Sequence, residues 1–129
     1  MPPINLIHVD DDSLQHFAVQ WILEWINLQS TTVTSLSGLR SALVQSKFSI
    51  AILDGKFLDT PDWNIGFHLP AAYDLARIAG TQAIYVFSWE TSAKVSEGLW
   101  NRTPDGIFEK WLPWIIWLKS AIIARLQNI

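Results

Sequence analysis

The sequence contains no cysteine and little charge. The absence of cysteine from all 129 residues excludes disulfide bonds, zinc–thiolate sites and cysteine nucleophiles. Charged residues make up 16% of the chain and its formal net charge is −3, so the basic surface typical of proteins that hold phosphate backbones is not expected. We therefore predict no direct nucleic-acid partner. Hydrophobic residues make up 50%, which excludes a disordered tail.

Long hydrophobic runs and export signals are also missing. The most apolar run, 111–118, stops at Lys119 and is too short to cross a bilayer. The first residues, Met1-Pro2-Pro3, lack the basic segment of a signal peptide. We therefore predict a cytoplasmic protein with no membrane span, and a single domain over residues 1–129.

What the sequence does contain is a regular alternation of short apolar runs and helical periodicity. The runs 4–9, 31–36, 48–53, 83–87 and 106–109 predict five strands. Helices are predicted from Asp12 or Ser13 to Trp25, after a capping Ser37, and over 69–79, 91–99 and 113–127. This alternation predicts an α/β fold, a doubly wound five-stranded parallel sheet with five helices on its two faces.

Polar residues follow four of the predicted strands. These residues are Asp10 with Asp11, Asp54, Ser88 and Lys110. The carboxyl ends of parallel strands share one edge of the sheet, which is where ligands bind in such folds. Three carboxylates at one edge repel each other, and an all-oxygen set of this kind suits Mg²⁺. With an ammonium and a hydroxyl beside them, one carboxylate can act as a nucleophile and form an aspartyl phosphate.

Four motifs in order along nearly the whole chain resemble those of a two-component response-regulator receiver domain. They are Val9-Asp10-Asp11-Asp12, Ile52-Leu53-Asp54, Ser88 and Glu109-Lys110. The resemblance implies the flavodoxin-like receiver fold with strand order 2-1-3-4-5. It also implies a signalling module in phosphorelay signal transduction rather than an enzyme, with at most self-catalysed phosphotransfer and dephosphorylation.

The resemblance assigns a role to each matching position. Asp54 would be the phosphoacceptor, Ser88 the switch hydroxyl, and Lys110 the partner of a phosphoryl oxygen. The cofactor would be Mg²⁺, held by Asp10, Asp11, Asp54 and the backbone carbonyl of Lys56. The implied partners are a histidine kinase or phosphotransfer protein, and a downstream protein that reads a surface built from the fourth helix, fifth strand and fifth helix.

Several residues depart from the family pattern. Trp89 stands where a small residue normally borders the site, and Trp111 replaces the proline that normally follows the lysine. Ile107 occupies the place of the usual aromatic toggle, with Phe108 next to it. Lys56 and Glu90 lie at positions that modulate phosphoryl lifetime in the family, and the loop from Asp54 to Gly66 is longer than usual. Trp89 can act either as a lid on the site or as packing against that loop.

Eight tryptophans and few charges leave little polar covering for a small domain. The helical period places Trp21 and Trp25 in the core, and His8 is expected to be a hydrogen-bonded core residue. By contrast, Trp111, Trp114 and Trp117 belong to an apolar run that extends too far around the last helix to be covered by one sheet. We interpret this run as an interface, most simply that of a homodimer.

Two functional hypotheses remain open at this point. In the first, the protein is a phosphoaccepting receiver that uses Asp54 and Mg²⁺. In the second, it is a pseudo-receiver, which keeps the fold but acts as a phosphorylation-independent binding or dimerisation module. A phosphoester hydrolase with an aspartyl nucleophile is less favoured, because Lys56 stands two residues after Asp54, where such an enzyme places a second acid.

Overall fold

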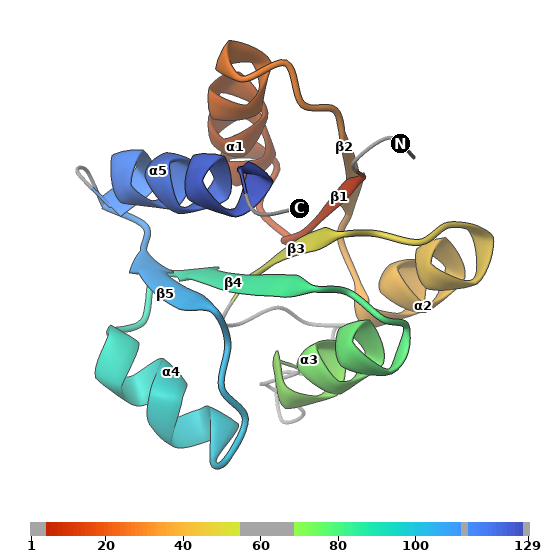
Figure 1. Ribbon diagram of the computed structural model, residues 1–129. Coiled ribbons are helices and arrows are strands. Elements are labelled where there is room, and N and C mark those ends of the chain that lie inside the picture. Colours follow the sequence, from red (N-terminus) through yellow and green to blue (C-terminus); the bar gives the residue numbers. More distant parts are fainter. Residues whose placement is uncertain (1–4, 55–68, 112–113, 128–129) are drawn as a thin grey trace.

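The computed structural model describes residues 5–54, 69–111 and 114–127 (Figure 1). Lys56 and the long loop as far as Gly66 lie outside this range, as does the side chain of Trp114. Within the described ranges, no helix combines the length and apolar content that a bilayer crossing requires.

The centre of the molecule is a five-stranded sheet in which every neighbouring pair is parallel. The order is β2-β1-β3-β4-β5, as predicted. The strands are β1 (Leu6–Val9), β2 (Ser30–Val33), β3 (Ile50–Asp54), β4 (Ala83–Ser88) and β5 (Gly106–Glu109). All residues of β1, β3 and β4 are buried, which explains why these strands appear as continuous apolar runs rather than alternating ones.

Five helices cover the two faces of the sheet. They are α1 (Ser13–Trp25), α2 (Leu36–Gln45), α3 (Leu69–Ile78), α4 (Ser92–Leu99) and α5 (Trp114–Leu126). Helices α1 and α5 pack on one face, and α2, α3 and α4 pack on the other (Figure 1). Each face has its own apolar cluster: Val9, Leu53 and Val86 point toward α2–α4, while Ile52, Tyr85 and Phe87 point toward α1 and α5.

The second strand and second helix differ from the prediction in their bounds. The strand ends at Val33, and α2 begins at the buried Leu36 rather than after Ser37. Ser35 is the N-cap: its backbone is extended, and its hydroxyl accepts a hydrogen bond from the Gly38 amide at 3.0 Å. Ser35 and Ser37 are both suitable N-cap residues, so the local sequence does not distinguish them. The helix begins after Ser35 because this start places Leu36 in the core.

The prediction that Trp21 and Trp25 belong to the core is wrong. Trp21 is 60% exposed and Trp25 is 66% exposed, whereas Val19, Ile22 and Leu23 on the same helix are buried. Helix α1 carries an aliphatic stripe and an aromatic stripe, and both have helical spacing. Periodicity cannot tell which stripe packs on the sheet; the structure places the aliphatic one there.

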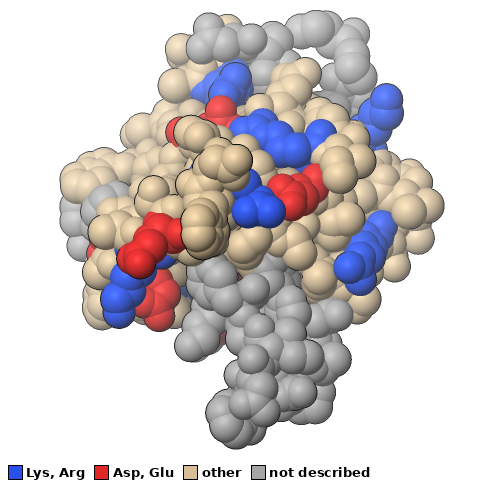
Figure 2. All heavy atoms as spheres, turned by 90° about the horizontal axis from the view of Figure 1, so that it is seen from below, with Lys and Arg blue, Asp and Glu red and all other residues tan. Residues whose placement is uncertain are grey.

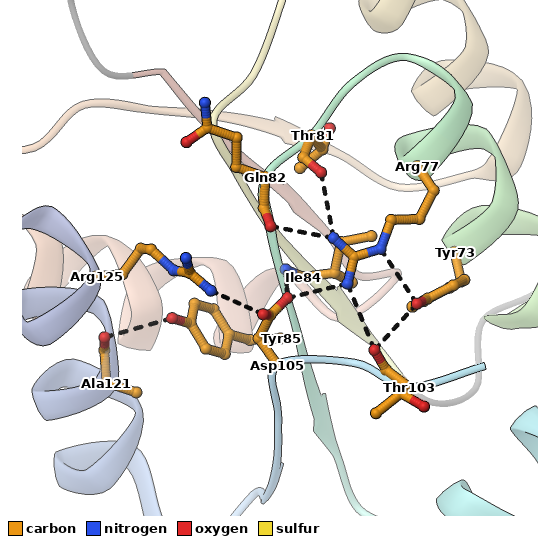
Figure 3. A network of polar contacts seen from close by, with 10 residues as sticks. All are labelled: Tyr73, Arg77, Thr81, Gln82, Ile84, Tyr85, Thr103, Asp105, Ala121 and Arg125. Atoms are coloured by element: carbon orange, nitrogen blue, oxygen red, sulfur yellow. Dashed lines mark hydrogen bonds and ion pairs between the residues drawn. The ribbon is translucent and has the colours of Figure 1, made fainter. Parts of the chain in front are cut away.

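Asp105, which immediately precedes β5, joins both faces at the edge of the sheet opposite the carboxyl ends (Figure 3). Its Oδ2 accepts hydrogen bonds from the Ile84 amide at 2.8 Å and from Arg77 of α3 at 3.1 Å. Its Oδ1 accepts one from Arg125 of α5 at 2.8 Å. A single carboxylate thus ties one helix on each face to the start of β4.

Arg77 extends this network toward the end of α4. Its guanidinium also donates to the carbonyls of Thr81 and Gln82 at 3.3 and 3.1 Å, and to the hydroxyl of Tyr73 at 3.1 Å. That hydroxyl in turn donates to the Thr103 carbonyl at 3.0 Å (Figure 3). The carbonyls of Thr81, Gln82 and Thr103, which lie between these elements, therefore all receive hydrogen bonds from side chains.

We expect Asp105→Ala to lower the free energy of unfolding by about 1–3 kcal/mol, because it leaves the Ile84 amide without its side-chain acceptor and removes the carboxylate that bonds to both Arg77 and Arg125. The measurement is urea unfolding followed by circular dichroism. The matched control is Asp74→Ala, which also removes a carboxylate bound to an arginine, Arg102, at 2.8 Å. On the face of the molecule shown in Figure 2, acidic and basic side chains lie close together at the surface. The Asp74 side chain is half exposed, so its loss should cost clearly less. Equal costs would contradict the role given to Asp105.

Candidate functional site at the carboxyl edge of the sheet

Four polar side chains that end strands are buried together. Asp10 follows β1, Asp54 ends β3, Ser88 ends β4 and Lys110 follows β5; none of the four is more than 6% exposed. The parallel register aligns these ends, pairing Val9 with Leu53 and Ser88 with Glu109. The sheet therefore brings together the residues that the sequence analysis placed at this edge.

The ammonium group of Lys110 is the central contact of the site. Its Nζ lies 2.7 Å from Oδ2 of Asp10 and 3.2 Å from Oδ1 of Asp54. Lys110 follows the edge strand β5, so its side chain reaches past β4 and β3 to a residue that follows β1. Buried charges are tolerated only when they are paired, and here one cation serves two anions.

The carboxylates of Asp10, Asp11 and Asp54 converge. One oxygen from each lies within 4.8 Å of the others, with Asp11 exposed to solvent and the other two buried. Three carboxylates against one ammonium leave an excess of negative charge, and an all-oxygen set with one side open to water is what Mg²⁺ prefers. The donor set thus fits a magnesium ion. The fourth expected ligand, the carbonyl of Lys56, lies outside the described residues.

The ionisation of Asp10 reflects these contacts. Burial by itself would raise the pKa of the Asp10 carboxyl, but the nearby His8 ring, the Lys110 ammonium and the Asp12 amide together hold that pKa below its ordinary value. The Asp12 amide donates to Oδ1 of Asp10 at 2.9 Å. Asp10 is therefore an anion at neutral pH.

Two histidines lie beneath the site, and sequence reasoning did not connect them with it. His8 is buried as predicted, but it is not hydrogen-bonded: among the described residues neither ring nitrogen has such a partner, and Nε2 lies 3.7 Å from Asp10. The ring of His16 lies 4.9 Å from that of His8 and bonds to the Asp10 carbonyl at 2.6 Å. His8 and Asp10 are two residues apart and so share a strand face, which is the signal that would have linked them.

Ser88 presents its hydroxyl at the same edge. Its Oγ accepts a hydrogen bond from the Glu90 amide at 3.1 Å, and its carbonyl accepts one from the Lys110 amide at 2.8 Å. A hydroxyl that accepts one bond still has its proton to donate. The Glu90 side chain points toward α4, 3.9 Å from the ammonium of Lys94.

Trp89 and Trp111 form an aromatic pair beside Lys110. Their ring centroids are 5.1 Å apart in an edge-to-face arrangement, and each residue is about half exposed. The Lys110 ammonium lies 5.9 Å from the centre of the Trp89 ring and 5.8 Å from that of the buried Phe87. These distances are within the range of cation–π attraction. Trp89 therefore borders the ammonium side of the site. The loop of the alternative interpretation, in which Trp89 packs against residues 55–66, lies outside the described residues.

Ile107 and Phe108, which are neighbours on β5, point to opposite faces of the sheet. Ile107 packs with the cluster under α2–α4, whereas Phe108 packs with the opposite cluster, its ring 6.1 Å from that of Tyr85. Adjacent strand residues point to opposite faces. Phe108 therefore points away from the position, occupied by Ile107, to which the family resemblance assigns an aromatic side chain.

Comparison with known proteins agrees with this architecture. No family model and no curated protein matches the sequence. Among solved structures, a two-component response regulator from Clostridium difficile is 16% identical, with a TM-score of 0.75, and the match covers 98% of this chain and 99% of that one. A CheY-like receiver domain protein from Methanospirillum hungatei is 19% identical, with a TM-score of 0.75 and coverage of 98% and 96%. An orphan response regulator of H. pylori is 12% identical, with a TM-score of 0.72 and coverage of 97% and 99%. The protein has the fold of response-regulator receiver domains.

Removing the ammonium should destabilise the site. We expect Lys110→Ala to lower the free energy of unfolding by about 3–5 kcal/mol at neutral pH, because two buried carboxylates lose their common counter-ion. Added Mg²⁺ should restore part of the loss by supplying a cation at the same place. Urea unfolding with and without MgCl₂ measures both effects, and the exposed Lys94→Ala is the control. A Lys110→Ala variant as stable as the wild type without Mg²⁺ would refute this account.

The buried His8 should make stability depend on pH. Burial lowers the pKa of His8 below its ordinary value of 6.5, so the unfolded chain takes up this proton first as the pH falls. The contribution of the neutral His8 to the free energy of unfolding is therefore complete above about pH 6.5, and it declines as the pH drops below this value. We expect His8→Phe to flatten this decline in urea unfolding measured across mildly acidic pH, and His16→Gln to retain it. An unchanged slope in His8→Phe would show that another group is responsible.

Proposed function

We propose that the protein is a response-regulator receiver that accepts a phosphoryl group on Asp54. The observation that supports this most is the buried arrangement of Asp10, Asp54 and Lys110, with the ammonium within 3.2 Å of both carboxylates. A structural ion pair would need only one acid per base. Here two acids converge with a third, Asp11, and face a hydroxyl and an ammonium at the ligand-binding edge of the sheet.

The chain's own residues can perform the transfer in the following way. A carboxylate oxygen of Asp54 attacks the phosphorus of an acyl phosphate or phosphohistidine donor, and the bond from phosphorus to the donor oxygen or nitrogen breaks with its electron pair going to the donor. Lys110, already 3.2 Å from Asp54, pairs with a phosphoryl oxygen. Asp10, Asp11 and Asp54 would hold a Mg²⁺ ion, which would neutralise part of the negative charge of the incoming phosphoryl group.

The proposed switch begins at Ser88. Its hydroxyl can turn toward a phosphoryl oxygen. This rotation would move the segment that leads from β4 into α4, because the Ser88 hydroxyl accepts a hydrogen bond from the Glu90 amide in that segment. Trp89 moves with that segment, so its contacts with Lys110 and Trp111 would change together. The surface of α4, β5 and α5 would then present two states to a downstream protein, and the donor would be a histidine kinase or phosphotransfer protein.

Phosphorylation can be tested directly. With acetyl phosphate and Mg²⁺, we expect the intact protein to gain the mass of one phosphoryl group, and Asp54→Asn to gain none because the nucleophile is lost. Asp74→Asn, an acid on α3 outside the site, is the matched control and should be labelled like the wild type. A Mg²⁺-dependent change in Trp fluorescence that disappears in Trp89→Phe gives a second readout. An unlabelled wild type, or a labelled Asp54→Asn, would refute the proposal.

The second candidate is a pseudo-receiver that acts by docking as a homodimer through the region of the last helix. It is favoured by the exposure of Trp111, Ile116 and Trp117, each roughly half exposed on and before α5. Similarity to an orphan regulator is compatible with both candidates. Trp114, the remaining residue of the expected interface, begins α5.

Light scattering discriminates this candidate. A dimer through α5 should dissociate at least about tenfold more readily in Trp117→Glu, because a carboxylate would be placed in an apolar contact. Trp100→Glu, which changes an equally large and still more exposed tryptophan after α4, is the control. A protein that stays monomeric at high concentration, or a dimer that tolerates Trp117→Glu, would remove the α5 interface.

A further inference from the structure

Helix α1 carries an aromatic stripe on its solvent side. Phe17, Trp21 and Trp25 are 72%, 60% and 66% exposed. Their spacing of four residues places them in one line along the helix, and the rings of Trp21 and Trp25 contact each other edge to face at 6.0 Å. We call these three residues the α1 stripe.

The α1 stripe is held in place from below and from one side. Val19, Ile22 and Leu23 anchor the opposite side of α1 in the core under the sheet. The ammonium of Lys119, on α5, lies 5.4 Å from the centre of the Trp25 ring and joins the two helices by a cation–π contact. A surface that is already ordered loses less entropy when it binds.

The size of the stripe suits a protein interface. An aromatic side chain offers roughly 150–250 Å², so three residues exposed to this degree present on the order of 400 Å² of apolar surface. That matches the largest patches on monomeric proteins, which are often functional. It is about half of the roughly 800 Å² that each partner contributes to a standard interface. Polar flanks such as Gln20 and Glu24 can supply the remainder as a rim.

We infer that the α1 stripe is the contact with a second copy of this chain, with the two α1 helices antiparallel across a two-fold axis. A line of three aromatics with Trp21 in the middle is complementary to itself under such an axis: Trp21 meets its own symmetry mate, and Phe17 meets the partner's Trp25. Only the antiparallel arrangement brings unlike ring types together at both ends.

The charges at the two ends of the stripe favour the same arrangement. Asp12, which is not one of the three carboxylates of the metal site, immediately precedes α1 at the Phe17 end, whereas Lys119 lies over Trp25 at the other end. In the antiparallel dimer, the Lys119 ammonium of each copy therefore approaches the acidic end of the other. A parallel arrangement would bring like charges together instead.

This contact is separate from the α5 interface considered above and does not depend on phosphorylation. Lys119 faces α1, and Trp117, two residues earlier, projects about 200° away around the helix. A substitution at Trp117 therefore leaves the α1 stripe intact. Dimerisation through α1 and phosphoryl transfer at Asp54 can consequently succeed or fail independently of each other.

Sedimentation velocity from low to high micromolar concentration tests the inference. We expect the wild type to shift from monomer to dimer, and Trp21→Glu to raise the dimer dissociation constant at least about tenfold. Phe17→Gln serves as a milder second variant, and Lys119→Glu should also weaken the dimer. Trp117→Glu and Trp100→Glu are matched controls that should dimerise normally. Circular dichroism verifies that each variant is folded.

Cross-linking tests the orientation, since the chain has no cysteine of its own. A single cysteine introduced by Gln20→Cys lies beside the predicted axis and should give a dimer with a short bis-maleimide, whereas Ser96→Cys on α4 should not. A monomeric wild type, or a dimer broken by Trp117→Glu and not by Trp21→Glu, overturns the inference. A monomer that instead sediments with phosphatidylglycerol vesicles would assign the stripe to a bilayer surface and overturn it as well.

Discussion

The buried ammonium of Lys110 is the contact on which the carboxyl edge of the sheet depends. Asp10 and Asp54 end neighbouring strands and lie out of contact with bulk water, so their charges must be balanced within the protein. Lys110 comes from the far edge strand and bonds to both. In the order β2-β1-β3-β4-β5, β4 lies between β5 and β3, so the lysine side chain has to cross the end of β4 to reach Asp54. The strand order and the ion pairs of the site therefore depend on each other.

The surroundings of this ion cluster differ from side to side. The exposed Asp11 opens it to water, the neighbouring His8 and His16 rings lie beneath it, and Trp89 lies against the ammonium side. In the proposed receiver, metal would enter from the side of Asp11, while the phosphoryl group would meet Ser88 and Lys110 close to Trp89. Because Trp89 contacts Trp111, a movement of Trp89 would change the contacts of a residue that lies three positions before the first residue of α5.

All six tryptophans whose side chains the structure describes lie at the surface rather than in the core. The cores under both faces of the sheet are mainly aliphatic. Apart from Trp100, which follows α4, the exposed tryptophans among the described residues lie in two separate regions. One is the α1 stripe; the other surrounds Trp111 and Trp117, beyond the opposite side of α5. Keeping aromatic residues exposed is costly for a monomer and useful for a protein that meets partners.

The sequence by itself determined the fold class and, through its family resemblance, the strand order. It also determined which residues gather at one edge, because apolar runs that end in Asp10, Asp54, Ser88 and Lys110 leave few other arrangements for a parallel sheet. Only the tertiary structure decided which stripe of α1 faces the sheet, because the aromatic and aliphatic stripes have the same period. It also decided that His8 lies beside Asp10 without a hydrogen bond, and that Phe108 points away from Ile107. Such outcomes depend on which surfaces fill the space between helix and sheet, and that is a property of packing rather than of local pattern.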